Sequence, residues 1–372
     1  PFMNLELSRR GFTGLQIGAI GSIRSVVILV MASIFSRIAD KHSIRVKMIR
    51  WFMIMAGIGV ALFSFPKTFL WLVAAAIFMS FWQSPLDSLA NSILVRMAKK
   101  YAVDFGMMTF WGAAAFATTN LVGGAIWDSV GFNWIYLTGG VMYLLVSFIA
   151  ATLEEPQPED QPPEVQPKKT ITEHKQPLKP VIIVFLAGFF VFSLAFFNAF
   201  GFTGPILDMR GASEFIIGLV GTMIGLGGMF VRWGNQRLLT RISLESAMIL
   251  GIMMGVIPII VYGWVENVTI LLLVSLLRGA GWGMFSLCAI RFIDNHARVE
   301  NASTLQSSLV MLNTFSNIIS STLSGYLFDT NPTLIFVIST IAALVALGIL
   351  LVVQRMSRKE TIRSLAEAVP KN

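Results

Sequence analysis

The chain has few charged residues, almost no cysteine and no histidine inside an apolar segment. Only 13% of its 372 residues are charged, against roughly a quarter in a soluble domain. Its single cysteine, Cys288, excludes a disulfide framework. The three histidines, His42, His174 and His296, fall in expected loops, which argues against a histidine metal site or a histidine proton relay in the membrane. The sequence has no phosphate-binding loop, no Walker-type lysine and no nucleophile–base pair within its apolar segments, so we expect no ATP drive, no enzymatic activity and no cofactor.

What the chain does have is apolar surface. Hydrophobic residues make up 55% of the sequence, and the mean hydropathy is +0.73. A soluble protein of this length needs far more polar surface, so we expect a lipid bilayer to cover the outside. The net charge of +8 could suggest a nucleic-acid partner. The basic residues lie in short loops between apolar runs, however, without a basic stripe and interleaved aromatics, so we expect no nucleic acid.

Long apolar runs determine the expected architecture. A bilayer core requires about 20 apolar residues per helix, and this length predicts one group of membrane-spanning helices, a polar gap and a second group. The expected helices cover 15–36, 48–65, 69–95, 106–127 and 132–153, and then 180–204, 215–237, 246–263, 268–291, 303–327 and 333–354. The fold class is therefore an all-α membrane protein.

A segment rich in proline and charge, 154–179, separates the two groups of helices and is typical of a linker. We expect an N-terminal bundle over 1–153, the linker, a C-terminal six-helix bundle over 180–354 and a tail over 355–372. With the linker and tail in the cytoplasm, that face carries most of the 28 Lys and Arg residues, as the positive-inside rule requires. We therefore expect a multi-pass protein of the cytoplasmic (plasma) membrane with a cytoplasmic linker and C-terminus.

The two groups of helices are related by a faint repeat. Ile17-Gly18 recurs as Ile217-Gly218, and Met48-Ile49 recurs as Met248-Ile249. Such a repeat in a very apolar chain is typical of a transporter built from two similar halves related by a pseudo-two-fold axis. The helix expected at 180–204 has no counterpart upstream of Pro1, so we expect this chain to lack the first transmembrane helix of its first bundle.

A charged loop follows the first expected helix and reads Ser36-x-x-x-Asp40-Lys41-x-Ser43-x-Arg45-x-Lys47. Together with the two halves and the long linker, it resembles the loop after the second helix of the major facilitator superfamily, Gly-x-x-x-Asp-Arg/Lys-x-Gly-x-Arg-Arg/Lys, with serines in place of both glycines. The resemblance implies two six-helix bundles that rock about a central site in a monomer. It also implies a cytoplasmic gating loop whose carboxylate caps a neighbouring helix in one state. The gating residues would be Ser36, Asp40, Lys41, Ser43 and Arg45.

A finer resemblance is to the branch that contains lactose-permease-like, phenylpropionate and nucleoside proton symporters. It rests on Pro85-Leu86-Asp87, Trp111-Gly112 and Gly325-Tyr326-Leu327-Phe328-Asp329. The branch usually has an arginine two residues before the Trp-Gly pair, where this chain has Thr109. The resemblance implies a small solute, sugar-like or nucleoside-like, that moves together with a proton.

Among the 20 acidic residues, only Asp87 is expected well inside an apolar helix. Gln83 and Asn91 lie at helical spacing from it and share one polar stripe. An acid in a transmembrane segment costs about 2.5–3.5 kcal/mol on insertion scales and is by default functional. Asp87 is therefore a candidate proton carrier, with Gln83 and Asn91 as further proton or substrate ligands. A salt bridge from Asp87 to Arg24 on the adjoining helix is the structural alternative.

Arg24 and Arg278 are expected at similar depths, one in each half. Two cations and one acid leave a net positive interior, which would suit an anionic solute with a carboxylate or phosphate. The alternative is that both arginines pair with Asp87 or with helix carbonyls. Arg232, nearer a helix end, is expected to extend toward the membrane surface.

These features together favour a secondary active transporter of a small organic solute. Proton symport is the expected mode, because Asp87 is the sole acid expected in the membrane. A proton-antiport exporter of drugs or metabolites with the same fold is an alternative, since the direction of transport follows the gradients. A non-transporting receptor on the same scaffold is a third possibility, because Thr109, Ser36 and Ser43 depart from the family pattern.

Overall fold

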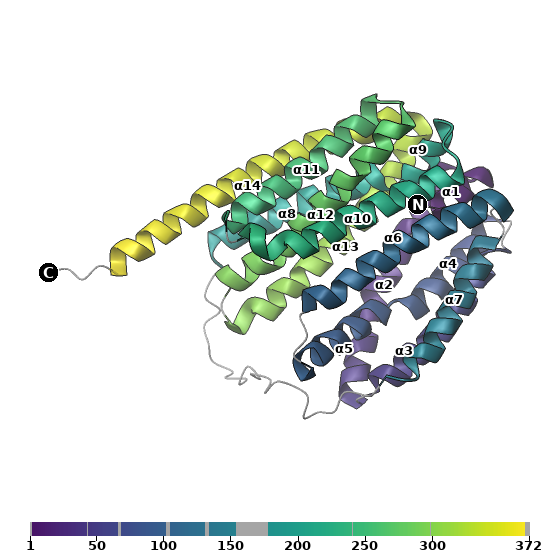
Figure 1. Cartoon of the computed structure of the whole chain (residues 1–372), viewed down its shortest axis with the longest axis horizontal. Helices are drawn as coiled ribbons and strands as arrows, with labels where there is room; N and C mark the ends of the chain where they lie inside the picture. Colours follow the sequence, from purple (N-terminus) through teal and green to yellow (C-terminus); the bar gives the residue numbers. More distant parts are fainter. Residues whose placement is uncertain are drawn as a thin grey trace.

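The chain folds into long helices arranged in two bundles (Figure 1). The computed structural model describes residues 2–42, 44–65, 68–101, 105–130, 134–153, 178–239, 241–297 and 299–368. Within these ranges there are fourteen helices and no strand. The first bundle contains α1 (Phe2–Arg9), α2 (Gly14–His42), α3 (Arg45–Leu62), α4 (Phe69–Gln83), α5 (Leu86–Lys100), α6 (Phe105–Val130) and α7 (Ile135–Ala150). The second contains α8 (Pro180–Phe200), α9 (Thr203–Met209), α10 (Glu214–Leu239), α11 (Leu244–Trp264), α12 (Val268–His296), α13 (Val299–Thr330) and α14 (Pro332–Ala368).

Helices dominate because a backbone in lipid must satisfy its polar groups within its own segment. In the described part of the chain, seven helices are long and apolar enough to cross a membrane. Two of them, α11 and α12, begin with a side-chain cap. At the start of α12, Asn267 accepts hydrogen bonds from the Thr269 and Ile270 amides, and at the start of α11 Ser243 accepts one from the Ser246 amide.

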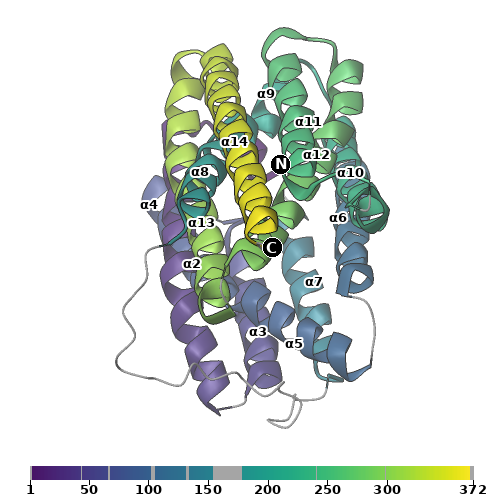
Figure 2. The same ribbon diagram turned by 90° about the vertical axis from the view of Figure 1, so that its left-hand side faces the viewer.

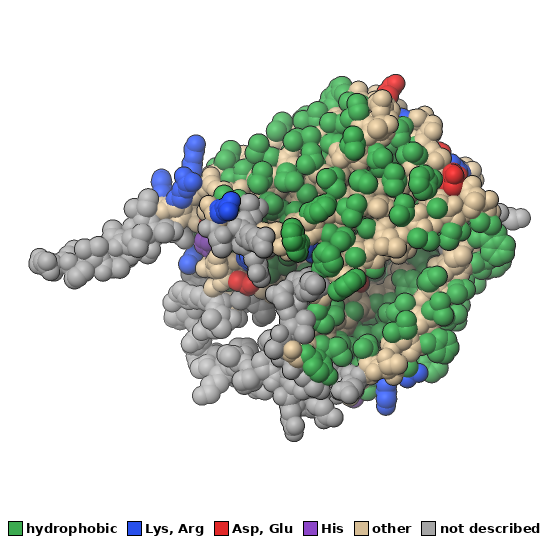
Figure 3. Space-filling model, in the orientation of Figure 1, with side chains coloured by type: hydrophobic (Ala, Val, Ile, Leu, Met, Phe, Trp, Pro, Cys, Tyr) green, Lys and Arg blue, Asp and Glu red, His purple; other side chains and the backbone are tan. Residues whose placement is uncertain are grey.

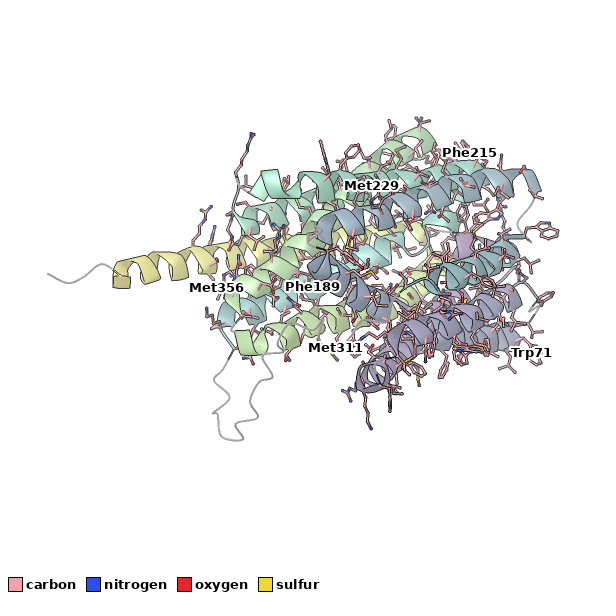
Figure 4. The ribbon with its side chains drawn as sticks, turned by 60° about the horizontal axis from the view of Figure 1, so that its bottom comes forward. Trp71, Phe189, Phe215, Met229, Met311 and Met356 are labelled. Carbon is pink, nitrogen blue, oxygen red and sulfur yellow. The ribbon has the colours of Figure 1, made fainter. Side chains whose placement is uncertain are left out.

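Apolar side chains cover the outer surface, and charged side chains gather at its two ends (Figure 3). Trp71 projects outward from α4, whereas Phe189 of α8 lies inside the second bundle (Figure 4). An exposed apolar surface of this extent is stable only against lipid. All-α membrane architecture in two bundles, as expected from the sequence, is therefore confirmed.

The two bundles meet at one end and separate at the other. We call the face where α7 ends and α8 begins the linker-side face, and the other the opposite face. One hydrophobic core runs from the second bundle into the opposite-face half of the first, through Phe2, Ile17 and Phe63. The linker-side half of the first bundle has a core of its own, which includes Ile49, Phe52 and Leu89. Over the described residues, the shared core of the two bundles therefore lies away from the linker-side face.

Two helix pairs form most of the contact between the bundles, α2 with α13 and α6 with α10 (Figure 2), and the short helices α1 and α9 add to it. Glycines bring the backbones together in both seams. A Cβ atom on Gly18 would overlap the carbonyl oxygen of Ser321, and one on Gly218 would overlap the carbonyl oxygen of Asn120. Small residues permit this close approach because helices in lipid associate by packing rather than by the hydrophobic effect.

Each helix expected from the sequence coincides with a helix of the structure, but several limits differ. The segment expected as one helix over 69–95 is broken between Gln83 and Leu86, because Pro85 lacks an N–H group and disrupts a continuing helix. The expected tail is helical as far as Ala368, because 355–368 contains neither glycine nor proline. The expected linker, 154–179, lies almost entirely outside the described residues.

Candidate functional site

A cavity lies between the bundles at mid-depth. Its inner part, the blind compartment, has a volume of about 320 Å³ and is lined by Asn4, Arg24 and Thr203 among others. Its outer part, the mouth compartment, has about 430 Å³ and is lined by Asn91, Met108 and Arg232 among others. Both parts share the walls Phe116, Ile224 and Arg278, so the two compartments adjoin. Volumes of this size suit a small organic molecule.

Arg278 of α12 separates the two compartments. Its guanidinium group lies over the ring of Phe200, with Cζ 3.8 Å from the ring centroid. Its Nη1 donates to the hydroxyl of Thr203 at 3.1 Å. Its buried Nε atom has no hydrogen-bond partner. The Phe200 ring and the hydrogen bond to Thr203 thus hold the guanidinium in position, while the Nε donor has no partner.

Arg24 of α2 lines the blind compartment. Its Nε donates to Ser80 Oγ at 3.3 Å, and its Nη2 donates to Gln83 Oε1 at 3.4 Å. Gln83 in turn donates from Nε2 to the hydroxyl of Tyr143 at 3.0 Å. The expected alternative, an ion pair between Arg24 and Asp87, is absent from the salt bridges of the described residues. The structure therefore links Arg24 to neutral polar groups.

Asp87 lies in the first turn of α5, directly after the break at Pro85, and its side chain is exposed. The positive end of the helix dipole there favours a carboxylate by roughly 0.3–1 kcal/mol. Asp87 is close enough to Tyr143 for the two groups to interact electrostatically. Asn91, one turn further along α5, lines the mouth compartment. The expected stripe is thus divided between two helices: Asn91 lines the cavity, Gln83 contacts it through Arg24, and Asp87 is not part of the lining of either compartment.

The predicted gating loop is described only in part. Ser36 Oγ lies 2.8 Å from Ser88 Oγ, which joins α2 to α5. Lys41 is exposed at the end of α2, whereas Arg45, the first residue of α3, is buried. The side chain of Asp40 and the whole of Ser43 lie outside the described residues. The latch role of this loop therefore stays a prediction.

Polar contacts between the bundles seal the cavity at the opposite face. Arg9 of α1 makes an ion pair with Asp208 of α9 at 2.6 Å and a second with Glu214 of α10. These hydrogen bonds, chiefly the one to Asp208, raise the pKa of Arg9 above its ordinary value. Asn4 donates to the Gly201 carbonyl at 2.8 Å. Among the described residues, these ion pairs and hydrogen bonds join the two bundles at the opposite face.

Several residues of the site were not expected from the sequence. Tyr143 and Thr203 form hydrogen bonds with the expected polar residues, and Arg232 lines the mouth compartment although it was expected to extend to the membrane surface. Glu6 is a second acid inside a bundle; it is buried in α1 and paired with Arg10. The first bundle therefore contains a buried acid besides Asp87, in a helix that is not among those long and apolar enough to cross a membrane. The sequence signal that could have revealed this pair was the spacing of Glu6 and Arg10, which are four residues apart and therefore lie on one face of a helix.

The described residues contain no group of three or more His, Cys, Asp and Glu side chains that could hold a metal ion. The lining can instead bind a solute through guanidinium, amide and hydroxyl groups beside aromatic walls.

Comparison with known proteins agrees with this architecture. A family model described as Major Facilitator Superfamily matches residues 1–321. A variant of the nucleoside transporter NupG superposes with a TM-score of 0.74 at 16% identity, covering 94% of this chain and 93% of that one. A bacterial homologue of the iron transporter ferroportin, in an inward-facing state, superposes with a TM-score of 0.71 at 15% identity, covering 94% of this chain and 93% of that one. A bacterial homologue of the human lysosomal transporter Spinster, inward-facing and unoccupied, superposes with a TM-score of 0.69 at 14% identity, covering 95% of this chain and 91% of that one. The search of curated proteins finds no match.

Proposed function

Because the chain belongs to the major facilitator superfamily, and is thus a secondary transporter rather than an enzyme, we propose that it carries a small organic solute together with a proton by alternating access. The observation that carries this proposal is the cavity between the bundles. It is sealed at the opposite face by the α2/α13 and α6/α10 seams and continues toward the linker side through its mouth compartment. A site between two halves is where a rocking transporter binds its solute.

The uneven packing of the bundles supports alternating access. At the opposite face the seams contain backbone contacts at glycine and a continuous core, whereas the linker-side half of the first bundle packs only on itself. Rotation of the bundles about the cavity would exchange these two arrangements, since packed interfaces switch between discrete states. The predicted gating loop with Asp40 and Arg45 would close the linker-side face in the other state.

A polar chain supports Asp87 as the proton carrier. Arg24 is hydrogen bonded to Gln83, Gln83 to Tyr143, and Tyr143 lies within electrostatic reach of Asp87. The charge of Asp87 therefore acts on the same network as a solute bound to Arg24. Protonation of Asp87 in the loaded carrier and its deprotonation in the empty one would couple the two movements.

The distribution of charge supports the orientation. Lys and Arg concentrate on the linker-side loops, so we place that face in the cytoplasm of a cell whose cytoplasmic membrane the protein spans. The described state would then be open toward the inside.

The test is uptake into proteoliposomes with an imposed pH gradient, over a panel of sugars, nucleosides and aromatic acids. We expect gradient-driven uptake by the native protein, and loss of it in Asp87→Asn with retention of solute exchange at equal pH. Asp294→Asn, on the exposed linker-side end of α12, is the matched control and should behave as the native protein. Proton movement against the solute would favour the exporter, and a folded protein that moves no solute of the panel would favour the receptor.

A further inference from the structure

The cavity is lined by cations and by no acid. Arg24, Arg278 and Arg232 all contribute to its walls, while the described lining of both compartments contains neither Asp nor Glu. Arginine keeps its charge at every pH that a protein tolerates. The space between the bundles is therefore permanently positive.

The two innermost arginines face the blind compartment from different bundles. Arg24 comes from α2 and Arg278 from α12. Over the residues that the structure describes, neither one forms an ion pair with an acid. The buried Nε of Arg278 lacks even a neutral acceptor. Buried charges without a partner are unfavourable, so residues of this kind are kept where a ligand supplies the opposite charge.

We propose, on the basis of the transport function above, that the solute is an organic anion whose carboxylate or phosphate group bridges Arg24 and Arg278 in the blind compartment. The ring of Phe200 occupies one face of the Arg278 guanidinium and Thr203 accepts from Nη1, which leaves the remaining N–H groups of the guanidinium to donate to the anion. The apolar walls Phe116, Val220 and Ile224 line the same compartment. The anion therefore carries an apolar body of about one ring, and inorganic phosphate alone does not satisfy the site.

The same geometry couples binding to movement. An intermediate closed at both faces would enclose the two like charges in a low-dielectric space, which is unfavourable when the cavity is empty. A bound anion offsets that repulsion. Exchange of one anion for another is therefore faster than the return of the empty carrier.

Binding to the purified protein in lipid nanodiscs, without any gradient, tests the proposal. The probes are phenylacetate, phenyl phosphate, the uncharged phenylacetamide, the cationic phenethylamine and inorganic phosphate, measured by calorimetry. We expect one of the two organic anions to bind about tenfold or more tightly than phenylacetamide, because the uncharged group leaves the arginines unpaired. Arg278→Gln should lower that affinity about tenfold or more, and Arg291→Gln, an exposed arginine further along α12, should leave it unchanged.

Equal or tighter binding of the amide or the amine overturns the proposal, as does binding of neither organic anion. Inorganic phosphate that binds as tightly as phenyl phosphate overturns the requirement for an organic body. The comparison of the acid with the amide uses the native protein, so it stands even where Arg278→Gln does not fold. If the protein binds the anion but shows no pH-driven uptake, proton coupling is refuted and the anion site is not. If it shows pH-driven uptake of a neutral nucleoside but binds no anion, the anion site is refuted and proton coupling is not.

Discussion

Asp329 of the second bundle caps the helix that Gly14 begins in the first. Its Oδ1 accepts a hydrogen bond from the Gly14 amide at 2.6 Å, and its Oδ2 accepts one from the Leu15 amide at 2.8 Å. The first amides of a helix have no partner within the helix, and the dipole there favours an anion. A capping interaction that usually stabilises a helix therefore also holds the two bundles together at the opposite face.

Asp329→Ala should weaken this seal without unfolding either bundle. Loss of a cap costs about 0.5–2 kcal/mol, and here the loss falls only on the state closed at the opposite face. We expect the population of the other state to rise by up to about 30-fold. The measurement is the rate at which a membrane-impermeant thiol reagent, added from the opposite side, labels Asn4→Cys in a Cys288→Ala background.

Asn331→Ala is the control for this variant. Asn331 accepts a hydrogen bond from the Thr333 amide and so caps α14 within its own bundle. Its loss should lower thermal stability by a similar amount but leave the labelling rate unchanged. Equal labelling rates in Asp329→Ala and Asn331→Ala would show that the capping interaction of Asp329 does not help to close the opposite face.

Gly18→Ala should prevent the α2/α13 seam from closing. A Cβ atom at this position would overlap the backbone of Ser321, which cannot give way as a flexible side chain does. Faster labelling from the opposite side is expected here also. An added Cβ at Gly348 meets no atom within 4 Å, so Gly348→Ala should transport normally. Normal transport in Gly18→Ala would show that the seam is not tight during the cycle.

Tyr143→Phe should separate solute binding from proton coupling. The substitution removes the hydroxyl that accepts from Gln83 and faces Asp87, while it keeps the aromatic ring. We expect solute affinity within about threefold of the native value, since one neutral hydrogen bond contributes about 0.5–1.5 kcal/mol at most. Uptake driven by a pH gradient should fall much further than exchange at equal pH. An equal fall in both measurements would assign Tyr143 a structural role.

The fold was accessible from the sequence because the bilayer sets the length of each apolar segment. The C-terminal ends of α2 and α14 could not be predicted in this way, because a helix continues into water wherever good helix formers follow the apolar run. The break at Pro85 was missed for a related reason: the hydropathy of 69–95 is continuous, although its backbone hydrogen bonds are not.

The site was accessible only in outline. Arg24 and Arg278 could be placed at similar depths by counting residues, but a shared cavity depends on which helix faces which neighbour. The partners Phe200 and Thr203 lie where α8 gives way to α9. As at Pro85, the break comes just before a proline, Pro205, in a segment whose apolar run predicts one continuous helix. Glu6 escaped detection because it belongs to a helix of only eight residues, too short to register as a membrane-spanning apolar segment.

The central claim, that the bundles rock about the cavity, is tested most directly by two distances measured in the same protein. In the Cys288→Ala background, spin labels at Lys41 and Asn295 report the linker-side face, and labels at Phe65 and Glu266 report the opposite face; all four positions are exposed. Double electron–electron resonance in nanodiscs should show the first distance shortening and the second lengthening when phenylacetate is added or the pH is lowered. Two distances that stay fixed, or that change in the same direction, would contradict alternating access in this protein.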